Sequence, residues 1–203
     1  MNAMPSLEFL FDFGSPNAYL VHRVLPAFSQ RTGVSVTHTP VLIGGIFKAT
    51  NNQPPMLAFA PVKGKLAYER LELTRFIKRH QIEFEMNPHF PVNTLHLMRG
   101  AIVAEQLGRS KDYIDLMMTN MWQSPKKLDD PDVIAQVLTD GGFDAQTFID
   151  KTQSPDVKQT LVDNTSGAVE RGVFGLPSFF VGQEFWYGKE RLEDIERFLS
   201  EAG

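Results

Sequence analysis

One serine in the segment FDFGSPNAYL, residues 11–20, stands where it could do chemistry, because it comes directly before a predicted helix. Serine is a favoured helix N-cap, and Pro16 suits the first helical position, where a missing N–H costs nothing. Ser15 therefore lies where unpaired backbone N–H groups and the positive end of the helix macrodipole converge. Such a place favours a bound anion or a thiolate. Taken alone, the segment is more simply explained by a plain helix cap.

The absence of cysteine limits the chemistry that Ser15 could support. A disulfide, a thiolate metal site and a cysteine nucleophile are all excluded, so a thiol would have to come from outside the chain. The five histidines show no metal-ligand spacing, and Gly44-Gly45 lacks the spacing of a phosphate-binding loop. We therefore predict no metal site and no phosphate-binding loop.

The composition is that of a globular protein with enough apolar residues for a packed core. The chain has 203 residues, of which 42% are hydrophobic and 16 are Phe. Its net charge of −4, with no long basic run, argues against a nucleic-acid partner. No apolar stretch approaches the roughly 20 residues that span a bilayer, and the N-terminus has no signal-peptide pattern. We expect no membrane association and a cytoplasmic location.

The elements that must position Ser15 begin with a βαβ unit. Residues 7–13 predict a buried strand, a helix follows Pro16, and residues 34–39 predict a second strand. Residues 41–65, rich in Gly, Asn and Pro, predict a long irregular connection. Four helical stripes follow, within residues 66–77, 95–102, 114–121 and 133–138. The methionines of the third stripe could form an adaptable ligand wall, but ordinary core packing is the simpler explanation.

The C-terminal part returns to strands. A helix begins at Ser154-Pro155 and runs to about residue 171, and the later pattern predicts strands at 178–181 and 183–187 and a helix over 189–199. This order predicts an α/β fold, in which a thioredoxin-like domain with a mixed four-stranded sheet carries a helical insertion. We place the thioredoxin-like domain at residues 1–41 and 154–203, and the helical insertion at residues 42–153.

Five segments together resemble the 2-hydroxychromene-2-carboxylate isomerase family, which belongs with kappa-class glutathione transferases and is related to the thioredoxin-like oxidoreductase DsbA. They are FDFGSPNAYL, GGIFKATNNQPP, FPVNTL followed by MR, RGVFGLPSFFVG and FWYGKERL, and the resemblance runs from Leu7 to about Leu199. It implies that Ser15 occupies the place of the first cysteine of a CxxC pair. Glutathione would then supply the missing thiol, and Ser15 would stabilise its thiolate. A DsbA-like redox role is excluded, because that role needs cysteine.

The same resemblance assigns the glutathione contacts. Leu176-Pro177 matches the family's cis-proline dipeptide, so the backbone of Leu176 would pair with glutathione in the manner of a β-strand. The remaining contacts would come from Asn52 and Lys63 at the glycine end, and from Lys189 and Glu190 at the γ-glutamyl end. At Glu190 the sequence departs from the family, which usually has Asp there. Without the resemblance, Lys189 and Glu190 are simply charged residues in the first turn of a helix.

The substrate site is expected to lie nearby. Lys48 and Asn93 recur in the family's patterns and could face the substrate, with Lys48 neutralising a developing enolate. Phe47, Tyr68 and Trp122 could wall an aromatic pocket, although aromatic residues at such positions are often core.

The predicted function is glutathione-dependent cis–trans isomerisation of an aromatic 2-oxo acid of the 2-hydroxychromene-2-carboxylate type. Two alternatives remain open at this point: a kappa-like glutathione transferase or peroxidase, and a non-catalytic glutathione-binding protein on a thioredoxin scaffold. Relatives of the kappa class are commonly dimers, so a homodimer is also expected from the resemblance.

Overall fold

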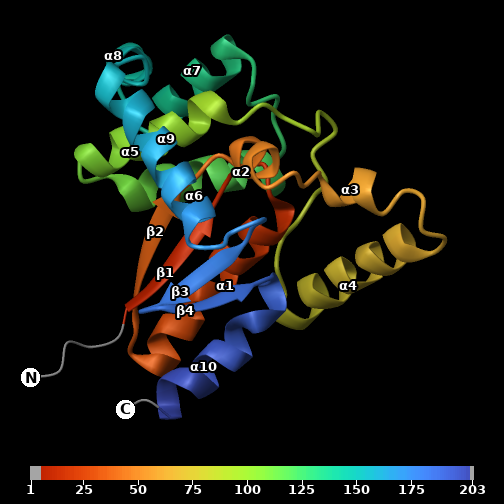
Figure 1. Ribbon diagram of the computed structural model, residues 1–203. Helices are drawn as coiled ribbons and strands as arrows, with labels where there is room; N and C mark the ends of the chain where they lie inside the picture. The colour runs from red at the N-terminus through yellow and green to blue at the C-terminus, as the bar shows by residue number, and fades with distance from the viewer. Residues whose placement is uncertain (1–5, 202–203) are drawn as a thin grey trace, which may run out of the picture.

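A four-stranded mixed sheet forms the centre of the protein, as the computed structural model, which describes residues 6–201, shows (Figure 1). The strand order is β2-β1-β3-β4. Strand β1 (Ser6–Phe11) pairs in parallel with β2 (Ser35–Pro40) and antiparallel with β3 (Ser178–Val181), which pairs antiparallel with β4 (Glu184–Tyr187). The predicted α/β fold with a mixed four-stranded sheet is confirmed.

Strand β1 is buried on both faces because it is a central strand with helices on either side. Leu7, Phe9 and Phe11 face one hydrophobic cluster, whereas Leu10 belongs to a second cluster that contains Phe180. The strand ends at Phe11, two residues earlier than predicted, and the chain then turns sharply, with the N–H of Ser15 donating to the carbonyl of Asp12.

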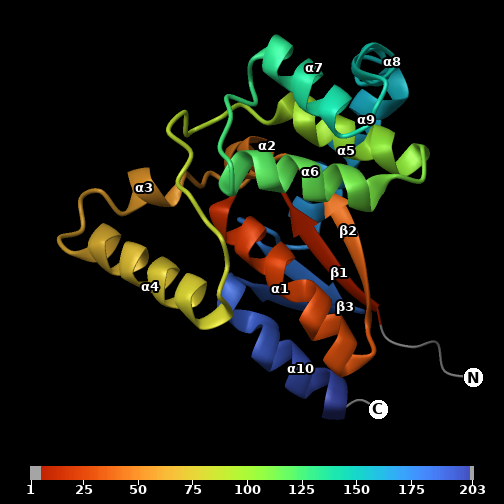
Figure 2. The same cartoon turned by 180° about the vertical axis from the view of Figure 1, so that it is seen from behind.

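Two helices cover the same face of the sheet (Figure 2). Helix α1 (Pro16–Thr32) connects β1 to β2 as predicted, and the C-terminal helix α10 (Leu192–Glu201) packs against it. The pattern over residues 189–199 predicted one helix, but the structure begins it with a separate 3-10 turn, η1 (Lys189–Arg191).

A group of helices lies beyond one end of the sheet (Figure 1). Its members are α5 (Leu95–Gln106), α6 (Ser110–Trp122), α7 (Pro131–Asp140), α8 (Ala145–Lys151) and the N-terminal part of α9 (Pro155–Glu170). The C-terminal part of α9 packs on the sheet, where Ala168 joins the cluster of Leu10 and Phe180. The sequence interpretation did not identify the short helix α8. The methionines of α6 are buried, which confirms that this stripe is core. Helix α9, which the sequence analysis assigned to the thioredoxin-like domain, packs against α5 of the predicted insertion. This contact does not test the predicted domain boundaries, which stay a prediction.

The segment predicted to be irregular contains two helices, α2 (Ile43–Ala49) and α3 (Pro55–Ala58). The two glycines of α2 disfavour a helix locally, but packing against α9 compensates. Helix α4 (Lys65–His80) extends away from the body of the molecule (Figure 1), and Phe76 is its one buried residue. Of the helices in residues 6–201, none has the length and apolar character needed to span a membrane.

Candidate active site

Ser15 caps α1 as the sequence predicted. Its Oγ accepts a hydrogen bond from the N–H of Ala18 at 3.2 Å, and no acidic residue stands in the first turn to offset the positive helix end. The hydroxyl proton has one acceptor among the described residues, the carbonyl of Leu176 at 3.5 Å. Since that contact is long, the proton is available to a sulfur atom placed beside it.

The turn before Ser15 is held by the buried carboxylate of Asp12. Its Oδ1 accepts from the N–H of Gly14 (2.8 Å) and the hydroxyl of Thr94 (2.6 Å), and its Oδ2 accepts from the N–H of Ile43 (2.8 Å). Burial raises the pKa of Asp12, while these three hydrogen bonds act in the opposite direction. One side chain thus fixes the end of β1 to the first turn of α2 and to the residue before α5.

The backbone of Phe13 is held from the helical side. Its N–H donates to the sulfur of Met98 on α5 at 3.4 Å, and its carbonyl accepts from Nε1 of Trp122 on α6 at 2.8 Å. Trp122 is completely buried. The predicted role of Trp122 as a wall of the substrate pocket does not fit this position, because a side chain with no exposed surface cannot contact a ligand. Instead, Trp122 helps to position the Ser15 turn.

The loop before β3 lies beside Ser15 in space, with the carbonyl of Leu176 3.5 Å from Ser15 Oγ. The Leu176–Pro177 peptide bond is cis, as the resemblance implied, and Phe90–Pro91 is a second cis bond that the sequence interpretation did not single out. Within residues 6–201, neither the N–H nor the carbonyl of Leu176 forms a backbone–backbone hydrogen bond. Apart from the long contact of its carbonyl with Ser15 Oγ, the backbone of Leu176 is therefore available to pair with a bound peptide.

Three of the remaining predicted glutathione contacts gather around this loop. Asn52 donates from Nδ2 to the carbonyl of Phe174 at 2.9 Å. The N–H of Gly188 donates to the carbonyl of Pro177 at 3.0 Å, which brings the following pair, Lys189 and Glu190, beside the cis-proline.

The Lys189–Glu190 pair is unequal in its exposure. The Lys189 side chain is 6% exposed, forms an ion pair with Glu190 and lies over the Phe76 ring, with Nζ 5.7 Å from its centroid. The Glu190 side chain is 49% exposed. Because the ammonium group is largely enclosed, the carboxylate is the member of the pair that a ligand can reach.

The other predicted residues form no hydrogen bond with Ser15 in the described structure. Lys63 is exposed in the loop before α4, and Tyr68 is exposed on α4. Phe47 is half-buried on α2. Asn93 is exposed, and its Oδ1 accepts from the N–H of Leu95 at the start of α5.

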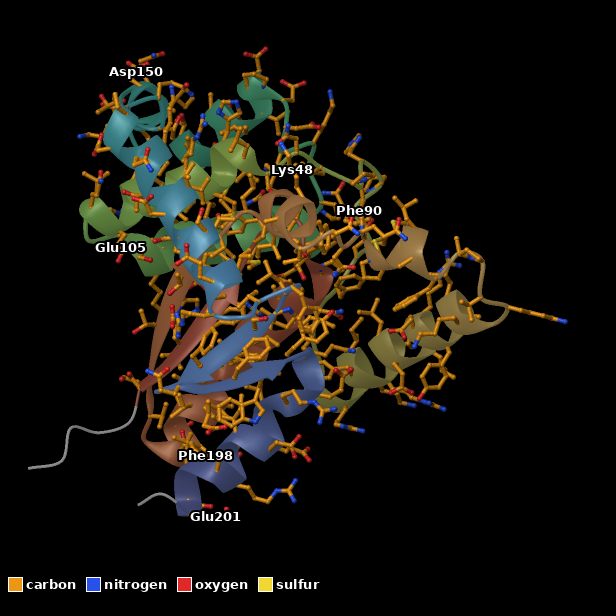
Figure 3. All side chains as sticks on the ribbon, viewed as in Figure 1. Lys48, Phe90, Glu105, Asp150, Phe198 and Glu201 are labelled. Atoms are coloured by element: carbon orange, nitrogen blue, oxygen red, sulfur yellow. The ribbon has the colours of Figure 1, made fainter. Side chains whose placement is uncertain are left out.

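Lys48, labelled in Figure 3, is exposed on α2. It lines a pocket between α2, α5 and α9, together with Arg99 and Lys158. None of the residues that line this pocket is a hydrogen-bond partner of Ser15 in residues 6–201.

The structure also reveals an aromatic pair that sequence reasoning missed. The rings of Phe174 and Tyr187 lie 4.6 Å apart between centroids, and each residue is about 40% exposed. Both belong to the Leu176 loop region, since Tyr187 packs closely over Gly175. The signal in the sequence was weak, because a phenylalanine before Gly175 and a tyrosine at the end of a strand are ordinary core residues in most proteins.

The assembled site offers a polar hydroxyl at a helix N-terminus, a free edge of backbone, an accessible carboxylate and an exposed aromatic surface. A group of three or more metal-ligating side chains is not found among residues 6–201. The arrangement is suited to binding a short peptide-like molecule by its backbone while stabilising an anion at Ser15.

Comparisons with known proteins identify the family and its relatives. The family model described as the DSBA-like thioredoxin domain matches residues 6–200. The 2-hydroxychromene-2-carboxylate isomerase of Pseudomonas sp. (strain C18) is 26% identical over 196 residues, covering 97% of this chain and 91% of the relative. Glutathione S-transferase kappa 1 of Homo sapiens is 27% identical over 223 residues, covering 99% and 94%. The resemblance to these two groups is therefore confirmed.

Solved structures show the same fold. A structure of 2-hydroxychromene-2-carboxylate isomerase superposes with a TM-score of 0.83 at 24% identity, covering 97% of this chain and 95% of that one. A probable DsbA oxidoreductase from Streptomyces coelicolor superposes with a TM-score of 0.77 at 16% identity, covering 98% and 89%.

Proposed function

Because the chain belongs to the family of DSBA-like thioredoxin domains and yet contains no cysteine, we propose that it binds glutathione at Ser15 and uses the glutathione thiolate as a nucleophile. The reaction we propose is the cis–trans isomerisation of an aromatic 2-oxo acid of the 2-hydroxychromene-2-carboxylate type. The observation that carries the proposal is the Ser15 hydroxyl, held at the N-terminus of α1 and 3.5 Å from the carbonyl of Leu176.

The residues around the cis-proline support the proposal that glutathione binds here. The cysteinyl backbone of glutathione would pair with the N–H and carbonyl of Leu176, which form no backbone–backbone hydrogen bond in the described structure, and its sulfur would then lie toward Ser15. At the γ-glutamyl end, the ammonium group would meet the exposed carboxylate of Glu190. Asn52 and Lys63 remain the proposed contacts of the glycine end. Glu190 has one methylene more than the aspartate usual in the family, and its exposure gives it room to adjust.

Thiolate stabilisation is the main task that we assign to Ser15. A hydroxyl donor and the positive end of a helix both favour the charged form of a thiol, so the pKa of the bound thiol falls below its usual value of roughly 8.5. The chain itself adds no thiol that could compete.

In the proposed reaction, the thiolate forms a C–S bond to the electrophilic carbon of the ring-opened substrate, and the electron pair of the double bond moves to the 2-oxo group as an enolate. The former double bond is now single and rotates. The enolate then re-forms the double bond in the trans geometry and expels the thiolate, so glutathione is regenerated. We keep Lys48 as the candidate cation for the enolate and propose Phe174 and Tyr187 as the aromatic surface.

The test combines binding with turnover. Titration of glutathione with the protein, followed by the ultraviolet thiolate band, should show a thiol pKa well below roughly 8.5. Incubation with 2-hydroxychromene-2-carboxylate should then yield the trans isomer while the free glutathione concentration stays constant. An unshifted thiol pKa in the complex would contradict the role of Ser15.

A second function deserves a direct comparison, because glutathione S-transferase kappa 1 relatives match nearly the whole chain. A transferase uses up free glutathione as a conjugate, and a peroxidase oxidises it. Stoichiometric loss of glutathione during turnover would therefore replace the isomerase proposal by one of these. Glutathione binding with no change in thiol pKa and no turnover would instead favour a non-catalytic binding protein.

A further inference from the structure

A pocket of about 440 Å³ lies where helices α2, α5 and α9 meet. Each of the three helices contributes one cation to its lining, namely Lys48, Arg99 and Lys158. Apolar side chains, among them Leu95, Leu161 and Val162, form much of the remaining wall. We refer to this cavity as the α2–α5–α9 pocket.

The cations of this pocket have no anionic partner within the described structure. No carboxylate is among the lining residues, and Lys48, Arg99 and Lys158 take part in no ion pair within residues 6–201. Arg99 also has an unsatisfied donor, because its Nε is buried and has no hydrogen-bond acceptor in the described structure. A buried N–H without an acceptor carries a free-energy cost, and guanidinium groups bind carboxylates through paired, parallel hydrogen bonds.

We propose that the α2–α5–α9 pocket binds a small organic carboxylate with an apolar body. The carboxylate would meet Arg99 and Lys158, and the apolar body would cover the leucines and Val162 of the wall. A volume of about 440 Å³ falls within the range of small-molecule sites, roughly 300–1,000 Å³, and leaves room for a ligand of this kind. An inorganic anion alone would leave the apolar wall in contact with water.

The Ser15 turn does not line this pocket. The hydrogen-bond partners of Ser15 are Asp12, Ala18, Tyr19 and Leu176, and none of them lines the pocket.

The two places are nevertheless joined through the protein. Leu42 and Leu95 line the pocket, and each is the chain neighbour of a residue that donates to the Asp12 carboxylate, Ile43 and Thr94 respectively. Lys48 lines the pocket and is also the candidate cation for the enolate, whereas Arg99 and Lys158, which would meet the carboxylate, have no role in the proposed reaction. The proposed carboxylate site therefore rests on Arg99 and Lys158, and its test does not depend on turnover.

Calorimetric titration with two matched probes tests the proposal. The probe 4-phenylbutyrate carries the proposed carboxylate, and 4-phenyl-1-butanol has the same apolar body without the charge. A charge-assisted hydrogen bond contributes about 1.5–3 kcal/mol, so we expect the acid to bind at least about tenfold more tightly than the alcohol.

Variants then locate the binding. Arg99→Gln should reduce the preference for the acid to less than about threefold, whereas Arg70→Gln, an exposed arginine on α4, should leave it unchanged. Val162→Glu provides a second test at an exposed position, because Val162 is 55% exposed and a carboxylate there would repel the acid.

Any of these results would overturn the proposal: no binding of 4-phenylbutyrate at millimolar concentration, equal affinity for acid and alcohol, an unchanged preference in Arg99→Gln, or an unchanged affinity in Val162→Glu. Titration with saturating glutathione separates the two sites. An unchanged affinity for 4-phenylbutyrate supports a distinct site, and competitive displacement would show that the pocket is part of the glutathione site, which contradicts the inference. This experiment needs no turnover, so it can succeed even where the isomerase proposal fails.

Discussion

Replacing Ser15 by alanine should damage two properties by separate mechanisms. The first is stability, because Ser15→Ala removes the hydrogen bond from Ala18 to the cap at 3.2 Å. Loss of an N-cap costs about 1 kcal/mol, which for a chain of 203 residues corresponds to a fall in Tm of about 2–4 °C. The second is the proposed thiolate site, because the hydroxyl is the donor that would face the sulfur.

The second effect can be given a magnitude. A hydrogen bond to a charged group contributes about 1.5–3 kcal/mol, and 1.36 kcal/mol corresponds to one pKa unit. The pKa of the bound glutathione thiol should therefore rise by about 1–2 units in Ser15→Ala. Turnover should fall by about 10–1000-fold, the range for losing one positioned donor. The assays are ultraviolet titration of the thiolate band, steady-state kinetics and thermal unfolding of each variant.

Two controls separate the cap from the thiolate. Asp144→Ala removes a different N-cap, one that accepts from the N–H of Thr147 at 3.1 Å on α8, and should lower Tm without altering the thiol pKa. Ser15→Asp keeps a capping acceptor, but its carboxylate has no hydrogen-bond donor, so it should recover much of the stability and none of the thiolate stabilisation. A Ser15→Ala variant with normal turnover and an unchanged thiol pKa would refute the assignment.

Three further predictions concern the support of the fold. Asp12→Ala leaves two backbone N–H groups and the Thr94 hydroxyl without their acceptor. The free energy of unfolding, measured in urea, should therefore fall by about 2–5 kcal/mol. A fall of less than about 1 kcal/mol would contradict the role of this hydrogen-bond network. Burial, with a smaller effect from the neighbouring His22, lowers the pKa of His38 from 6.5 to about 4. The unfolded chain therefore binds this proton first as pH falls, so up to about 3 kcal/mol of stability, present above pH 6.5, is lost by about pH 4. His38→Leu should flatten this part of the stability profile in urea unfolding at a series of pH values, and an unchanged slope would count against the burial argument. Finally, Gly100→Ala would place a Cβ 2.1 Å from the Tyr113 hydroxyl and should lower the unfolding free energy by at least about 2 kcal/mol. The control Gly167→Ala has open space around it and should raise the unfolding free energy by up to about 1 kcal/mol. Similar calorimetric Tm values for the two variants would contradict the packing around Gly100.

Much of the candidate site was predictable because its signals are local. A serine before Pro16 marks a helix start, since capping depends on residues within one turn. The missing cysteines are a fact of composition, and they exclude disulfide chemistry whatever the fold. The position of Leu176-Pro177 before a predicted strand, taken with the resemblance, indicated the loop that faces Ser15.

Other parts could not be predicted, because they depend on which distant segments pack together. The tryptophan at position 122 could equally have lined a pocket or filled the core, and only the fold decides that its Nε1 reaches the carbonyl of Phe13. Likewise, the glycine-rich α2 is helical because tertiary packing overrides its weak local preference.

The sequence by itself thus determined the periodic strands and helices, the capping serine and the absence of an internal thiol, since each of these rests on neighbouring residues or on composition. The tertiary structure decided that Asp12 accepts from groups 31 and 82 positions away. It also decided that Arg99 faces a shared pocket with cations from two other helices. A buried polar group must find a partner because water is excluded from it, and that partner can lie far away in the sequence. The residues next to Asp12 or Arg99 in the sequence therefore do not show which distant groups each side chain contacts.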